Sequence, residues 1–173
     1  DELGIHYIEG GWPGSNPKDA EFFKRARDLL LSHAVLVAFG STRRPNAAAS
    51  ADPNLIALID SGVRVVTIVG KSWDNQVTRV LETTLEENLA MIADSVAFLK
   101  SKGLTVFFDA EHYFDGVKSN ADYALRTLQA VSAAGADCVV LCDTNGGSLP
   151  GEIAAMVESA AGQVKVPLGI HAH

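Results

Sequence analysis

One unit recurs along this sequence and limits what the chain can fold into. Each copy is a short apolar run, a polar turn, and a stretch with helical periodicity. Three apolar runs end at Gly10, Gly40 and Gly70, and this 30-residue spacing suits one strand–helix unit. The expected strands cover residues 5–9, 34–39, 63–69, 104–108, 138–142 and 168–170. Strands that are apolar along their whole length are typical of a parallel sheet covered on both faces.

Helix starts are marked between these strands by N-cap residues or by proline at the first helical position. We expect helices to begin near Pro17, with Asn16 as the N-cap, and near Asp52, Thr84, Ser119 and Pro150. Thr84 and Glu87 have the spacing of a capping box. In the first helix we expect an apolar face made of Phe22, Phe23, Ala26, Leu29 and Leu30.

Alternating strands and helices leave two architectures, a doubly wound open sheet and a (β/α)8 barrel. Polar residues follow nearly every expected strand. In a barrel all carboxyl ends of the strands meet at one mouth, whereas in an open sheet only those beside the switch point do. We therefore predict an α/β fold, a (β/α)8 TIM barrel of which this chain covers about strands 2–7. A full barrel needs roughly 250 residues, so we expect residues 1–173 to be a partial catalytic domain without strands one and eight or any C-terminal regulatory domain.

Charge and composition exclude several classes of protein. Asp and Glu number 21 against 14 Lys and Arg, a net charge of −7, which disfavours nucleic-acid binding and a basic membrane-surface helix. No apolar run approaches the roughly 20 residues of a membrane-spanning helix. Cys138 and Cys142 lie in an apolar stretch, and we interpret them as reduced core thiols of a cytoplasmic protein.

The sharpest chemical signal is the segment His171-Ala172-His173. Residues two apart on a strand face the same way, so both imidazoles could bind one divalent ion, for which Zn, Mn, Fe and Co are candidates. The alternative is a chance pair on a solvated strand end. His6 and His33 lie near strand starts, and we expect them to be structural.

Polar residues after other strands supply candidates for substrate binding and proton transfer. Glu111 follows the strand expected at 104–108 and could act as general acid or base. Asp109 should face the same side and could raise the pKa of Glu111. Thr144 could hydrogen-bond a substrate carboxylate, although Asp143 and its neighbours could equally serve only the turn.

Two further segments have alternative interpretations. Glu9 precedes Gly10 and Gly11, which either let the backbone approach a ligand or simply make a tight turn. We expect Glu9 and Asp109 to join Thr144 in substrate binding. Lys71 could neutralise a phosphate, or the segment 71–73 could pack as a capping loop because it contains Trp73.

Six segments, taken in order, resemble one enzyme family. They are residues 7–19, 38–44, 70–74, 108–112, 141–147 and 169–173. The resemblance is to the 2-isopropylmalate, homocitrate and citramalate synthases, which are related to metal-dependent acyl-CoA lyases on TIM barrels. The segments Gly-Gly-Trp-Pro-Gly at 10–14 and Gly-Lys-Ser-Trp-Asp at 70–74 favour the citramalate branch.

The resemblance implies an acyltransferase that performs a Claisen-type condensation of acetyl-CoA with a 2-oxo acid. Pyruvate would give citramalate, in the cytoplasmic biosynthesis of isoleucine, leucine and related branched-chain amino acids, and the parent protein would be a homodimer. His171 and His173 would ligate a divalent metal ion (Mn, Mg, Zn or Co), Glu111 would be catalytic, and Thr144 would contact the 2-oxo acid carboxylate.

Other functions remain open from the sequence. They are 2-isopropylmalate synthesis, a metal-dependent acyl-CoA lyase or aldolase on the same fold, and a non-catalytic binding role. The family's strand-one Arg-Asp pair and strand-eight asparagine have no counterpart within these residues, so we expect residues 1–173 alone to be inactive.

Overall fold

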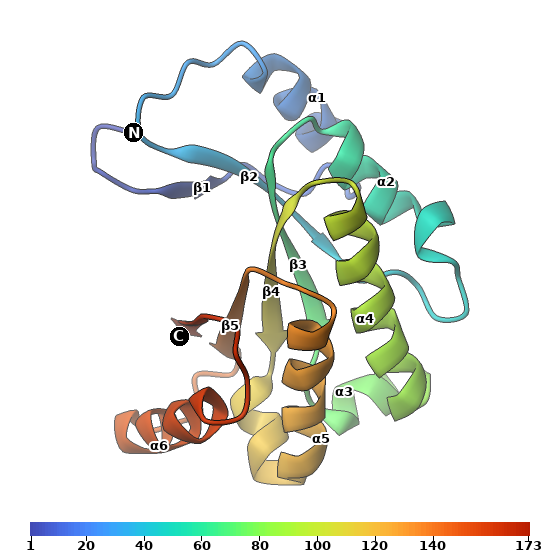
Figure 1. Ribbon diagram of the computed structural model, residues 1–173, viewed down its shortest axis with the longest axis vertical. Coiled ribbons are helices and arrows are strands. Elements are labelled where there is room, and N and C mark those ends of the chain that lie inside the picture. Colours follow the sequence, from blue (N-terminus) through green and yellow to red (C-terminus); the bar gives the residue numbers. More distant parts are fainter.

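The protein is built around a single curled sheet of six parallel strands, seen in a computed structural model that describes all of residues 1–173 (Figure 1). Neighbouring strands in the sheet are neighbours in the sequence, from first to last. They are β1 (Tyr7–Glu9), β2 (Val35–Ser41), β3 (Val65–Lys71), β4 (Thr105–Glu111), β5 (Cys138–Asp143) and β6 (Leu168–Ala172). An open sheet whose strand order reverses is therefore excluded, and the barrel-type α/β prediction is confirmed.

Six α-helices and one short 3₁₀ helix connect the strands. They are α1 (Pro17–Ala26), η1 (Ala49–Ala51), α2 (Pro53–Asp60), α3 (Asp74–Arg79), α4 (Leu85–Ser101), α5 (Tyr113–Ala133) and α6 (Pro150–Ala161). Three predicted N-caps are present, because the side chains of Asn16, Asp52 and Thr84 accept hydrogen bonds from backbone N–H groups of the first helical turn. None of the helices has the combined length and apolar character needed to cross a membrane.

Each strand presents one face to the helices and the other to a concave interior. The outward face and the helices form a buried apolar core of 20 residues, in which Val66, Ile68 and Phe108 meet Leu58 and Leu99. In Figure 1 the helices α2, α4 and α5 lie on one side of the sheet, away from both termini. The inward face is left open at the carboxyl ends of the strands, which positions the candidate site.

Two of the three regularly spaced glycines have a different role from the predicted one, whereas Gly10 does follow the end of β1. Gly40 and Gly70 lie inside β2 and β3 instead of ending them, and both strands continue to polar residues. A Cβ atom on Gly70 would lie 2.6 Å from the Phe108 ring, and one on Gly40 would lie 2.9 Å from Leu58. These glycines therefore allow side chains of the core to press against the sheet.

Two helical stretches were not predicted, and one apolar face extends beyond its helix. The helix expected from Ser119 is the second part of α5, where Asn120 has a non-helical backbone (φ −151°) and its side chain accepts from the Tyr123 N–H as an N-cap does. The first part of α5, from Tyr113, was not predicted. The short helix α3 was not predicted. Leu29 and Leu30 lie beyond the end of α1 and are exposed, Leu30 at 99%, because the helix stops one turn before the apolar pattern does.

Arg43, whose side chain is buried, ties the segment after β2 to α4 through ion pairs with partly exposed Glu87 and exposed Asp94. Its guanidinium, 5% exposed, contacts Glu87 at 2.6 Å and Asp94 at 2.8 Å. Glu87 also accepts from the Asn46 N–H, so its carboxylate does not complete the capping box expected with Thr84. The hydrogen bond from Arg43, followed by that from Asn46, lowers the pKa of Glu87.

Removal of these ion pairs should destabilise the fold in a pH-dependent way. A lowered carboxylate pKa adds stability above the ordinary value and loses it as pH falls through the folded-state pKa. We expect Arg43→Met to reduce the free energy of unfolding by about 1–3 kcal/mol at neutral pH. Urea denaturation followed by circular dichroism measures the loss, and it should shrink below about pH 4.

Arg44→Met is the matched control, since Arg44 is the adjacent residue and its side chain is exposed. Its effect should be within about 0.5 kcal/mol of zero. A loss for Arg43→Met that stays constant down to about pH 3 would contradict the assigned role of Glu87.

Candidate active site

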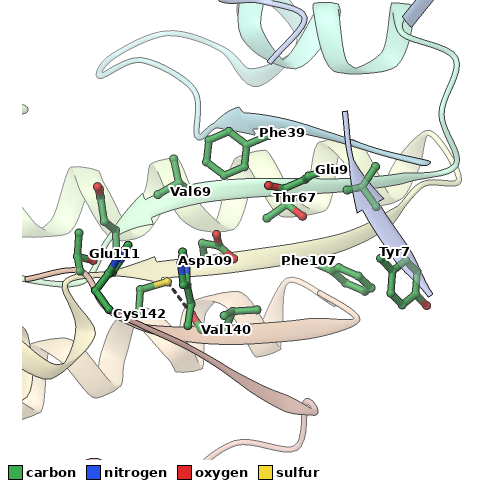
Figure 2. Close-up of a pocket in the computed structure, with 14 residues that line it drawn as sticks. Tyr7, Glu9, Phe39, Thr67, Val69, Phe107, Asp109, Glu111, Val140 and Cys142 are labelled. Carbon is green, nitrogen blue, oxygen red and sulfur yellow. Dashed lines mark hydrogen bonds between the residues drawn. The ribbon is translucent and has the colours of Figure 1, made fainter. Parts of the chain in front are cut away.

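A cavity of about 520 Å³ opens on the concave face of the sheet, and all six strands or the residues just after them contribute to it (Figure 2). Its walls are largely apolar, with Val37, Phe39 and Val69 among them. Six residues that the sequence suggested for the site line this cavity: Glu9, Asp109, Glu111, Thr144, His171 and His173. They converge because the carboxyl ends of parallel, curled strands point to one mouth.

His171 and His173 project from the same side of the chain, as the period of two requires. Their ring centroids are 4.8 Å apart, with the rings inclined by 38°. His171 lies within β6, and His173 directly follows it. Two imidazoles this close suit a divalent cation, and their role as ligands stays a prediction.

A second potential ligand set includes a residue that the sequence pattern placed in the core. The carboxylate of Asp109, the sulfur of Cys142 and a ring nitrogen of His171 all lie within 4.8 Å of one another. Cys142 is 5% exposed and lines the cavity, so it is not simply a core thiol. The sequence could have predicted that Cys142 faces the cavity, because Cys142 lies two residues before Thr144 and therefore shares its face. Nitrogen, oxygen and sulfur donors in this arrangement fit a divalent cation.

The strongest electrostatic perturbation falls on Asp109. Burial raises its pKa to about 7, and the negative charges of Glu9 and Glu111 add to the effect. In this pair of carboxylates the charge of Glu111 thus contributes to the raised pKa of Asp109. A cation placed beside Asp109 would favour its carboxylate form.

Lys71 and Glu111 form an ion pair at the edge of the cavity. They are directly opposite each other in the register of β3 and β4, and both side chains are mostly buried. The sequence suggested that Lys71 could neutralise a phosphate or belong to a packed loop; the structure places its ammonium on Glu111. The pair was missed because the predicted strands stopped two or three residues too early.

Asp143 and Thr144, at the end of β5 and in the turn after it, accept hydrogen bonds from backbone N–H groups. The buried carboxylate of Asp143 accepts from the backbone N–H groups of Gly147 and Ser148, at 3.3 and 3.1 Å. Thr144 Oγ1 accepts from the His112 N–H at 2.9 Å. Asp143 thus serves the turn, while Thr144 both lines the cavity and supports His112, whose backbone is left-handed (φ 56°).

A barrel-type sheet with histidines and carboxylates at the carboxyl ends of its strands is the arrangement found in barrel enzymes. The family described as HMGL-like matches residues 1–173, and the chain belongs to this family.

Two relatives show which branch of the family this chain resembles more. The chain is 53% identical over 173 residues to a protein named (R)-citramalate synthase from Geobacter sulfurreducens, covering 100% of this chain and 33% of that protein. It is 26% identical over 174 residues to 2-isopropylmalate synthase from Methanocaldococcus jannaschii, covering 100% of this chain and 31% of that protein. The chain therefore spans about a third of the length of these relatives. The expected resemblance to the citramalate branch is confirmed.

A solved structure supports the fold alone. Hydroxymethylglutaryl-CoA lyase from Pseudomonas aeruginosa superimposes with a TM-score of 0.75 at 20% identity, covering 99% of this chain and 57% of that one.

Substitutions of Thr144 test the hydrogen bond that its hydroxyl oxygen accepts from the His112 N–H. Thr144→Val removes the acceptor of the His112 N–H and should lower the free energy of unfolding by about 1–3 kcal/mol. Thr144→Ser keeps the hydroxyl and is the matched control, with a much smaller expected loss. Urea denaturation measures both, and equal stability of the two variants would show that the hydrogen bond contributes little.

Proposed function

We propose that the protein to which these residues belong is an acyltransferase that condenses acetyl-CoA with pyruvate to form citramalate. The observation that carries the proposal is the 53% identity to an (R)-citramalate synthase across the whole cavity-forming segment, against 26% to a 2-isopropylmalate synthase. The proposal includes a divalent metal ion, a homodimer, a cytoplasmic location and a place in branched-chain amino-acid biosynthesis. The barrel domain itself is proposed to continue beyond the six strands.

His171 and His173 would hold the metal ion, which when bound supplies a Lewis acid that polarises the ketone of the 2-oxo acid. Thr144 lines the same cavity, and its hydroxyl would donate a hydrogen bond to the substrate carboxylate while its oxygen accepts from His112. The apolar walls would exclude water from the reacting carbons.

Glu111 is the proposed catalytic residue. Its carboxylate lies at the cavity edge, where Lys71 fixes its position and balances its charge. A carboxylate held in this way could accept the proton that leaves the methyl group of acetyl-CoA. Asp109 and Glu9 line the deeper wall, and we propose that they contribute to substrate positioning.

The complete protein should release CoA from acetyl-CoA when pyruvate and a divalent cation are present. His171→Ala and His173→Ala should each reduce the rate by at least about 100-fold, as should chelation of the metal. Detection of free thiol during turnover measures the rate. His6→Ala is the matched control, since His6 is an exposed histidine outside the cavity and should keep full activity.

Other substrates separate the remaining alternatives in the same assay. Turnover with 2-oxoisovalerate but not with pyruvate would favour a 2-isopropylmalate synthase. Cleavage of a 3-hydroxyacyl-CoA without any condensation would favour a lyase. Full activity of the His171→Ala,His173→Ala double variant in the presence of chelator would contradict the metal-dependent reaction.

Lys71 should act as a positioning residue for Glu111. Lys71→Met removes the charged partner of Glu111, and a lost hydrogen bond to a charged group is worth about 1.5–3 kcal/mol. We expect kcat to fall about 10–100-fold with a small change in the KM for pyruvate. Lys100→Met is the control, because Lys100 forms a comparable pair with Asp137 outside the cavity. Equal kinetics of the two variants would contradict the role of Lys71.

A further inference from the structure

We propose that Asp109, Cys142 and His171 form a site for a soft divalent cation such as Zn²⁺, with the cysteine sulfur as a ligand. The site is different from the pair of histidines considered above, although both use His171. It follows from the placement of these three side chains and does not depend on the identity of the reaction.

The three side chains come from consecutive strands, β4, β5 and β6. Cys142 lies directly opposite His171 in the strand register. All three ligand atoms are within 4.8 Å of one another. Ligands of one tetrahedral Zn²⁺, with bonds of about 2.0–2.3 Å, lie roughly 3.5 Å apart. Side-chain adjustments of about 1 Å therefore suffice to enclose an ion.

The position of Cys142 makes its sulfur available to an ion in the cavity. Figure 2 shows the sulfur and the Asp109 carboxylate on the same face of the sheet, toward the interior. The thiol has only a long contact to the Val140 carbonyl oxygen, at 3.6 Å, so a stronger partner could replace it. Coordination would release the thiol proton to solvent, and the sulfur would donate an electron pair to the cation.

The donor set determines which cations the site should select. Thiolate sulfur and imidazole nitrogen suit Zn²⁺ and Co²⁺, whereas Mg²⁺ prefers oxygen donors. The negative charges of the thiolate and of Asp109 would balance the charge of the ion. Because His171 belongs to both sets, a soft cation held by Cys142 would compete with a metal ion held by His171 and His173.

Cobalt reports a sulfur ligand directly, because a thiolate bound to Co²⁺ gives a charge-transfer band in the near ultraviolet. The complete protein, freed of metal by chelation, should develop this band on titration with Co²⁺. The band should disappear in Cys142→Ala and in His171→Ala, and persist in His173→Ala. Cys138→Ser is the matched control: Cys138 is four residues earlier on the same strand, about 13 Å away, and the band should persist.

Each contrary result overturns the proposal. Absence of the band in the unaltered protein excludes a thiolate ligand, and its persistence in folded Cys142→Ala assigns the sulfur to another cysteine. Loss of the band in His173→Ala would show that there is no separate site.

A measurement without variants decides the matter if Cys142→Ala does not fold. In crystals of the unaltered protein soaked in Zn²⁺, the anomalous zinc peak should lie about 2.3 Å from Cys142 Sγ. A peak bonded only to His171 and His173 would overturn the proposal.

The test of this site and the test of the proposed function are independent of each other. A protein that makes citramalate without a Co²⁺–thiolate band refutes this site alone, and a band without condensation refutes the proposed function alone.

Discussion

Parallel pairing in chain order is the constraint on which the rest of the structure depends, because it gives every strand the same two faces. Residues at alternate positions either pack under the helices, as Phe108 does, or project into the cavity, as Asp109 does. The register then sets which polar residues meet. Lys71 faces Glu111, and Cys142 faces His171, because those residues are opposite each other in adjacent strands. A slip of one residue in any strand would exchange its cavity residues for core residues.

The cavity gathers more negative charge than its own residues neutralise. Glu9, Asp109 and Glu111 line it, and Lys71 neutralises only Glu111. Burial beside the other two carboxylates raises the pKa of Asp109 to about 7, which means that the charged form is costly without a cation nearby. A divalent cation bound by imidazole and carboxylate groups would offset this cost, and it would also attract an anionic 2-oxo acid. Both the raised pKa of Asp109 and the proposed reaction therefore favour a divalent cation in this cavity.

Most of the fold was predictable because it depends on local patterns. Apolar runs located all six strands, and Asn16, Asp52 and Thr84 marked three helix starts. The errors arose where tertiary contacts override local signals. Gly70 resembled a strand end but is an in-strand position pressed by Phe108. The site residues on strand ends were predictable from the barrel geometry, whereas the Lys71–Glu111 pair and the inward-facing Cys142 depend on register, which a single sequence does not specify.

The cavity at the carboxyl ends of the strands is proposed to bind the metal ion and the 2-oxo acid together. A crystal structure of the complete protein with Mn²⁺ and pyruvate, recorded at the manganese absorption edge, tests this most directly. We expect an anomalous peak within about 2.3 Å of ring nitrogens of His171 and His173, with pyruvate on the cavity side of the ion beside Thr144. A manganese ion bound outside the cavity, or pyruvate bound away from it, would contradict the proposed site.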